Sequence, residues 1–547
     1  MIKHNSILLF IFLSVCITPK SQAQIFDHVL DANNISITLD PTGTIAYGTM
    51  VNNYCHAPAG QLTSPLSASW LWLAGADQMG VVRDLCPQWE LPEEEIKVGP
   101  WSAYFDNKSE IEKDLAYIPY RRVWKISKAE IEYHKQHFND INYWMPEAIA
   151  NWPGSGDTSR GFAHLLAPFT DFNNNKIYEP ISGDYPNIKG DLAIFAMYND
   201  HAPDDISSFN PVSDLEVHVL LYAFYDSPAS LLGNTIFANY NIINRGTFNY
   251  GEFYAGILSD FSLGYTFDDY VGCDSSRNLF YVYNGDNSDD SIYGGYGTQI
   301  PAFGCVSLNM PLHSFMYRPG DNTIISKPIT ALERYYCLDA RFRDGSHMIY
   351  GGIGYDDDGG IPTNYMYSSD PRDINGWSEY TENNPPWDRR GYAGIGPYVF
   401  APGENICLEF AYVFAQPQYP SDRFEEIDLL KNYAGQLNAL YPFMYDETCL
   451  TYITDTLAEQ PDTLTQTFSL YPNPSHGEIN FILPVLTNEK FSCEVYDITG
   501  KLIYHAQFIN TKDYELHTLH LPFHANGLYI LRFNADGHEF SEKVVIR

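Results

Sequence analysis

Short apolar segments of strand length dominate the chain and predict a mainly β protein. Four such runs stand in the body of the sequence, at residues 192–198, 215–224, 235–243 and 406–414. Residues 69–75, Ser-Trp-Leu-Trp-Leu-Ala-Gly, read as a buried strand. Residues 35–39 alternate apolar and polar positions before a Pro-Thr-Gly turn, the pattern of a strand and hairpin. We therefore expect a β-sandwich-like body.

Helical periodicity is well marked in two segments. Ser127 and Glu130 have the spacing of a capping box, and apolar positions follow at helical spacing up to Phe138. The second helix is expected to be capped at Asp422, with one apolar stripe that reaches Tyr441. Such a stripe packs on a sheet, so the body should hold two helices beside its strands.

The N-terminus has the pattern of a secretory signal peptide over residues 1–23. Lys3 precedes the apolar run 7–17, which is too short to span a membrane, and Ser-Gln-Ala at 21–23 forms a small-x-small cleavage site. No later stretch reaches about eighteen apolar residues without a charge. We therefore expect an exported chain with no transmembrane segment after cleavage.

The rest of the chain divides into three parts. The body covers 24–445 and forms either one domain or two that divide near 155–165. Residues 446–465 carry five acidic residues and no Lys or Arg, which predicts an acidic linker. Residues 466–547 return to alternating strands separated by turns and predict a small antiparallel sandwich.

Four short motifs stand in order in this last part: Tyr471-Pro472-Asn473-Pro474 with Gly477, Asp497 with Gly500, Gly527 with Tyr529, and Lys543. The series resembles the type A C-terminal sorting domain of cargo proteins of the type IX secretion system. The resemblance implies an Ig-like β-sandwich that is recognised by the secretion machinery at the outer membrane. It also implies a protein that crosses the periplasm and is then secreted or attached to the outer surface.

The body resembles a family of cargo proteins of the same system that has no assigned activity. The matching stretches are 70–75, 123–127, 146–153, 167–171, 183–191, 268–274, 388–390 and 400–403. They span nearly the whole body. The resemblance implies no catalytic residues.

The net charge argues against binding to nucleic acid or anionic membranes, and the cysteine pattern bears on buried thiols and disulfides. The chain has 68 Asp plus Glu against 32 Lys plus Arg, a net charge of −36, so nucleic acid and anionic membranes should repel it. Cys493 alternates with Phe491 and Val495, which predicts a buried thiol in a strand. Seven cysteines belong to the body, an odd number that leaves at least one unpaired and the pairing open.

The strongest candidate for chemistry is a loop of oxygen-bearing side chains. Its expected calcium ligands are Asp171, Asn173, Asn175, the carbonyl of Ile177, Glu179 and Asp184. Calcium takes six to eight hard oxygen ligands, and this spacing suits a tight loop around the ion. Lys176 replaces the glycine preferred at the sharp turn and Ser182 the usual bidentate Glu, so affinity should be weak. The alternative is an Asn-rich surface turn.

A second acidic group, Asp260, Asp268, Asp269 and Asp274, fits either a cation site or, more simply, a solvated loop. Motifs for a serine nucleophile or a phosphate-binding loop are missing. We therefore expect a non-catalytic cell-surface or secreted protein, calcium-stabilised and used in adhesion, surface structure or the binding of a glycan or matrix ligand. The alternative is a secreted hydrolase acting on polysaccharide or protein.

Overall fold

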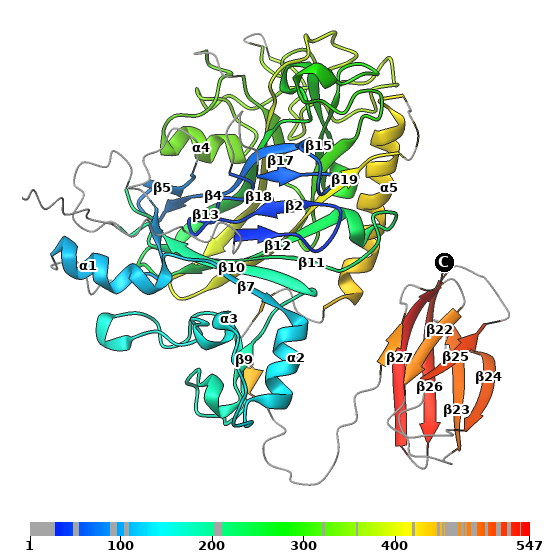
Figure 1. Ribbon diagram of the computed structural model, residues 1–547. Helices are drawn as coiled ribbons and strands as arrows, with labels where there is room; N and C mark the ends of the chain where they lie inside the picture. Colours follow the sequence, from blue (N-terminus) through cyan, green and yellow to red (C-terminus); the bar gives the residue numbers. More distant parts are fainter. Residues whose placement is uncertain are drawn as a thin grey trace, which may run out of the picture. The chain divides into compact units, whose positions relative to one another are not determined.

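The structure is a computed structural model of the chain (Figure 1). It describes residues 28–47, 54–87, 96–102, 109–201, 211–319, 323–356, 359–417, 419, 422–445, 449–450, 453–454, 469–471, 475, 478–482, 490–497, 501–509, 516–521, 527–535 and 538–546. The signal peptide expected at 1–23 lies outside these ranges. The chain separates into two compact units, Met1–Asp455 and Thr456–Arg547, and the boundary falls inside the segment predicted to be a linker.

Two large antiparallel sheets form the body. The larger has nine strands, in the order β14 (Asp269–Asp274), β15 (Leu279–Asn284), β16 (Ala302–Ser307), β19 (Asn405–Ala415), β12 (Thr235–Asn244), β11 (Leu215–Ala223), β10 (Leu192–Asn199) and β6 (Lys97–Val98), with β7 (Trp124–Ser127) also paired to β10. The smaller has five, in the order β17 (Ser314–Tyr317), β18 (Arg390–Phe400), β13 (Tyr250–Phe261), β4 (Leu66–Asp77) and β5 (Val82–Leu85). A short sheet of β1 (Val29–Leu30), β2 (Ser36–Thr38) and β3 (Cys55–His56) accompanies them.

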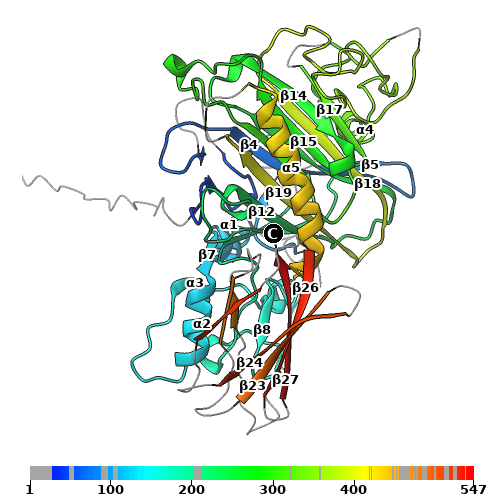
Figure 2. The same ribbon diagram turned by 90° about the vertical axis from the view of Figure 1, so that its right-hand side faces the viewer.

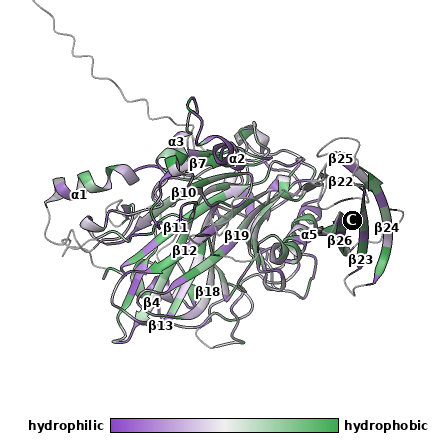
Figure 3. Ribbon diagram, turned by 90° about the horizontal axis from the view of Figure 1, so that it is seen from below, coloured by the Kyte–Doolittle hydropathy of each residue, from purple (hydrophilic) through white to green (hydrophobic). Residues whose placement is uncertain are grey.

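The two large sheets pack face to face as a sandwich. Both contribute to one apolar cluster, and the Tyr412 hydroxyl of β19 lies 2.8 Å from Ser69 Oγ of β4. Along β10, Ile194 and Tyr198 belong to this cluster, whereas Phe195 belongs to a second cluster on the opposite face. A two-residue period therefore supplies two cores, one on each face of the central strands. Figure 3 shows that apolar residues are frequent along these strands.

Helices cover the outer face of the nine-stranded sheet. They are α2 (Lys128–His137), α3 (Glu147–Ala150) and α5 (Glu425–Leu440). Helix α1 (Glu110–Tyr117) leads into the 3₁₀ turn Ile118–Tyr120, and α4 (Ala331–Leu338) packs on the smaller sheet. Figure 2 shows α5 running across β15 and β19. The apolar stripe of α5 faces this sheet, as expected, through Ile427, Leu430, Ala434 and Leu437.

The predicted helices and strands are present as helices and strands, but the start of α5 and the number of helices need correction. Ser127 and Glu130 form the expected capping box. The start of α5 was wrongly placed: Phe424 occupies the N-cap without a side-chain cap, and Asp422 instead accepts a hydrogen bond from the Phe424 N–H at 2.7 Å. Three further helices are present in the described chain, and α4 carries a capping box, Thr330 and Glu333, that the sequence displayed.

A second small sheet ties the start of the predicted linker to the body. Strand β20 (Ile453–Thr454) pairs in parallel with β8 (Phe169–Asp171), which pairs with β9 (Tyr185–Pro186). A disulfide between Cys407 of β19 and Cys449 adds a covalent tie. Cys449 and the strand Ile453–Thr454 are therefore part of the body's structure.

The C-terminal unit is a sandwich of two sheets. One holds β21 (Ser469–Tyr471), β22 (Glu478–Ile482) and β25 (Leu516–His520), and the other β24 (Leu502–Ile509), β23 (Lys490–Asp497), β26 (Gly527–Ala535) and β27 (His538–Ile546). Phe491, Cys493 and Val495 all point into its core, which confirms the alternation argument and the buried Cys493 thiol.

Candidate functional site

The loop predicted to bind calcium connects β8 to β9 and is held by helix α2. His134 of α2 is buried, with Nε2 3.0 Å from the carbonyl oxygen of Asp184 and Nδ1 3.0 Å from the Tyr143 hydroxyl. A carbonyl can only accept, so Nε2 carries a proton. Burial lowers the pKa of His134. The helix therefore positions the end of the loop.

Two carboxylates form the buried part of the loop. Asp171 and Asp184 are both fully buried. Asp171 Oδ2 accepts from the Lys176 N–H at 2.7 Å, and Asp184 accepts from the Phe172 N–H at 2.8 Å and the Glu179 N–H at 2.6 Å. Burial raises the pKa of Asp184, and the charges of Asp171 and Glu179 raise it further.

The remaining predicted ligands lie on the exposed side of the same loop. Asn173 and Asn175 accept from N–H groups two residues on, at 3.2 and 2.8 Å, and their amides donate to Glu179 Oε2 at 3.2 and 2.6 Å. Ile177 is exposed. Lys176 has a φ of 64°, the left-handed turn that a glycine usually supplies in calcium loops.

The donor chemistry of this loop suits calcium, because every side-chain donor is a hard oxygen. Nevertheless, within the described ranges no group of three His, Cys, Asp or Glu side chains has the arrangement of a metal centre. An ion would have to draw Glu179 away from the two asparagine amides.

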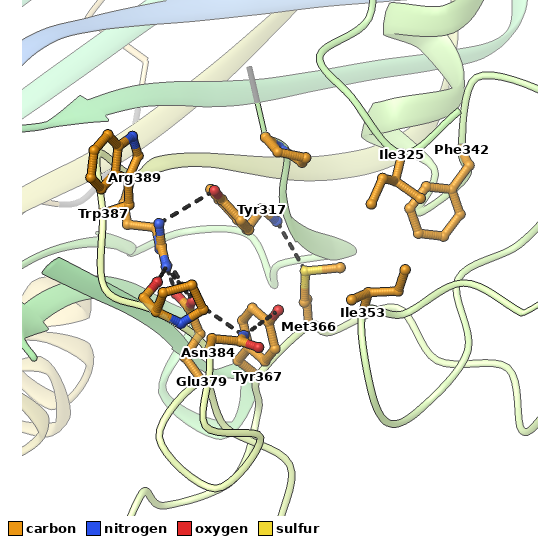
Figure 4. A pocket seen from close by; sticks show the side chains of 12 residues that line it. Tyr317, Ile325, Phe342, Ile353, Met366, Tyr367, Glu379, Asn384, Trp387 and Arg389 are labelled. Atoms are coloured by element: carbon orange, nitrogen blue, oxygen red, sulfur yellow. Dashed lines mark hydrogen bonds and ion pairs between the residues drawn. The ribbon is translucent and has the colours of Figure 1, made fainter. Parts of the chain in front are cut away.

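A pocket that the sequence did not reveal opens in the irregular segment between β17 and β18 (Figure 4). Its volume is about 350 Å³. The lining residues are Tyr317, Pro319, Ile325, Phe342, Ile353, Met366, Tyr367, Glu379, Asn384, Pro385, Trp387 and Arg389. They come from widely spaced positions with no common period, so no linear motif marks them.

A buried ion pair forms the polar part of the pocket. Arg389 donates to Glu379 through Nε at 3.0 Å and Nη2 at 2.8 Å, and its guanidinium lies 4.7 Å from the centre of the Tyr317 ring. Burial raises the pKa of Glu379 against the opposing charge of Arg389. Asn384 Nδ2 donates to the Tyr367 hydroxyl at 3.0 Å.

Apolar and aromatic side chains form the rest of the wall, and two of them face solvent. Trp387 is 59% exposed and Ile353 is 53% exposed. The Trp387 ring lies 4.8 Å from that of Phe267, centre to centre, which supports one of its sides. A concave site with aromatic walls and a few fixed polar groups is the usual form of a small-molecule site.

Three described residues of the sorting motif occupy strand ends in the C-terminal unit, and two more lie within strands. Tyr471 ends β21, Asp497 ends β23 and accepts from the Lys501 N–H at 3.1 Å, and Gly527 begins β26. Tyr529 is buried and Lys543 is exposed. Pro472, Asn473, Pro474, Gly477 and Gly500 lie outside the described residues.

Comparisons with solved structures add little about the body. A polysaccharide lyase is 9% identical over 62% of this chain and 35% of its own, with a TM-score of 0.20. Dimeric latent PorU from Porphyromonas gingivalis is 10% identical over 65% and 31%, with a TM-score of 0.13. The chain spans about a third of either protein, and likeness at this level carries no argument. No curated protein matches the chain.

The tail gives a clear result. Residues 469–547 match the model of the secretion system C-terminal sorting domain. Among the residues described, no helix is long and apolar enough to cross a membrane. A tail of this family directs export by the type IX secretion machinery, so the protein is secreted or lies at the cell surface. The chain is a cargo protein of the type IX secretion system that ends in its sorting domain.

Proposed function

We propose that the body of this cargo protein binds carbohydrate, and that the pocket beside Trp387 is the binding site. The observation that supports this proposal most directly is the exposed Trp387 ring, which lies next to the buried ion pair of Arg389 and Glu379. A sugar ring has an apolar C–H face that packs on an aromatic ring and hydroxyls that bond to fixed polar groups. A pocket of about 350 Å³ has the size of a site for one or two sugar units.

The pocket favours binding over hydrolysis. Glycoside hydrolysis uses two carboxyl groups on either side of the bond that breaks. Among the described residues that line the pocket, Glu379 supplies the carboxylate, and it is held by Arg389. The hydrolase alternative therefore ranks second, and release of reducing sugar from polysaccharides on incubation with the protein would reverse this order.

A glycan array followed by calorimetry with the best ligand tests the proposal. Trp387→Ala should weaken binding at least tenfold, because loss of a central aromatic at a binding site typically costs about 2 kcal/mol or more. Trp144, 89% exposed and not among the pocket residues, provides a matched control, and Trp144→Ala should leave affinity unchanged. A blank array, or equal loss in both variants, would refute the proposal.

We also propose that the Asp171 loop binds calcium weakly and that the ion stabilises the body. The support is the pair of buried carboxylates, Asp171 and Asp184, whose repulsion a divalent cation would relieve. Calcium should raise the melting temperature of the wild type, with an affinity on the order of 10⁻⁴ to 10⁻³ M. In Asp171→Asn this part of the calcium response should be lost, and an unchanged response would reject the site.

A further inference from the structure

Three acidic side chains from two separate segments meet near the edge of the nine-stranded sheet. Asp268 ends the 3₁₀ turn η8 (Thr266–Asp268), and Asp269 begins β14. Asp289 lies in the loop after β15, and its charge acts on both of the others. The cross-strand partner of Asp269 is Asn284, which is also buried.

This group differs from the acidic cluster expected from the sequence. Asp260 is paired with Arg390 at 3.1 Å, and Asp274 with Arg277 at 2.7 Å, so neither contributes an unneutralised charge. Asp289 takes their place because β14 and β15 pair and bring the following loop back. Only the strand pairing reveals this neighbour.

Two oxygens of the cluster have no hydrogen-bond donor. Oδ1 of Asp268 and Oδ1 of Asp269 are shielded from solvent and have no hydrogen-bond partner within the described residues, and the amide Nδ2 of the neighbouring Asn284 is likewise buried and unpaired. Asp269 is fully buried, and its Oδ2 accepts from the Leu263 N–H at 3.1 Å. A buried carboxylate oxygen without a donor is strongly disfavoured, so a positive charge or a proton is needed there.

Asp289 adds charge and is itself fixed. It is 1% exposed, and it accepts from the Tyr265 N–H at 2.9 Å and the Tyr296 N–H at 2.6 Å. A Cβ on Gly264 or Gly295 would collide with its carboxylate, so both glycines are needed for this close approach. The positive charge that acts on the Asp269 carboxylate is that of Arg389, and Arg389 is already paired with Glu379.

We propose that a hard divalent cation, calcium in external fluid, binds at Asp268 Oδ1 and Asp269 Oδ1. Asp289 contributes long-range attraction, because both of its oxygens are already occupied by N–H groups. Backbone or amide oxygens and water complete the coordination, as calcium allows. A site with two anionic ligands agrees with the lack of a three-acid metal centre in the described parts of the chain.

The ion would also stabilise the wall of the pocket, a consequence that rests on the proposed carbohydrate site. The backbone N–H of Trp387 donates to the backbone carbonyl oxygen of Asp269 at 3.1 Å, and the Phe267 ring packs on the Trp387 ring. The residue that we assign to sugar stacking thus contacts Phe267 within the η8 turn and Asp269 directly after it. Calcium should therefore strengthen sugar binding without contacting the sugar.

Equilibrium dialysis with calcium chloride tests the site on the full chain. Asp171→Asn serves as the background, because it removes the other candidate loop. We expect this protein to bind one calcium ion, and the added change Asp269→Asn or Asp268→Asn to abolish binding. Asp290, exposed and next to Asp289, provides a matched control: Asp290→Asn removes the same charge from the same loop and should leave one ion bound.

Thermal unfolding distinguishes loss of the site from loss of the fold. Calcium should raise the melting temperature of the Asp171→Asn background and leave that of the double variant unchanged, with the same circular dichroism spectrum for both. The proposal is overturned if the background binds no calcium, which would mean that the two aspartates share a proton. It is also overturned if both double variants keep the ion. A blank glycan array would refute the sugar site and leave this result standing.

Discussion

Asp200 Oδ2 accepts two hydrogen bonds from Ser213, one from its backbone N–H and one from its hydroxyl, both at 2.5 Å. Its Oδ1 accepts from the Leu215 N–H at 2.9 Å. Asp200 directly follows β10 and Leu215 begins β11, so one buried carboxylate joins the ends of two central strands.

This carboxylate should make stability depend on pH. Burial raises the pKa of Asp200 to about 6 from 3.8. Between these values the folded protein binds the proton more tightly than the unfolded chain, so the contribution of Asp200 to stability falls as pH rises from about 4 to 6. The difference is up to about 3 kcal/mol. Urea unfolding of the wild type and Asp200→Asn should show the wild type losing stability relative to the variant over this range. Parallel pH profiles would contradict this.

The disulfide between Cys407 and Cys449 should stabilise the body. It joins residues 42 apart in sequence, and a loop of this size corresponds to about 4 kcal/mol of lost unfolded-state entropy. Reducing agent should lower the urea midpoint of the wild type and leave Cys407→Ser/Cys449→Ser unaffected. The six described free cysteines are all buried, so equal sensitivity of both proteins would mean that the bond does not form.

Breaking the pocket ion pair should be much more damaging than breaking a surface pair. Glu379→Gln leaves Arg389 buried without its counter-charge and should cost about 3–5 kcal/mol of unfolding free energy. The matched comparison is Asp428→Asn, which breaks the exposed pair with Arg372 and should cost less than about 1 kcal/mol. Chemical denaturation measures both, and similar losses would show that Arg389 is not buried as described.

Export from the periplasm to the outside should require the C-terminal unit. A chain that ends before residue 469 lacks the sorting domain and should accumulate in the periplasm of a bacterium with a type IX system. The Trp387→Ala variant with an intact tail should reach the outside normally. Cell fractionation and immunoblotting distinguish the two, and efficient export of the truncated chain would contradict the role of the tail.

The sequence by itself determined the export tail and the mainly β character of the body. Motifs between Tyr471 and Lys543 stand close together in the chain, and the strands of the central sheet are apolar at nearly every position because both faces are covered. The calcium loop was also visible, because its donors are local, although its occupancy remains a prediction.

The pocket and the second acidic site were decided by tertiary structure. Glu379 and Arg389 are separated by an irregular segment, and Asp289 meets Asp269 only because β14 and β15 pair. The spacing of apolar residues along the sequence indicates which face of its own helix or strand a residue occupies. Which side chains meet across elements depends on strand register and loop paths, and these are fixed only when the whole core packs.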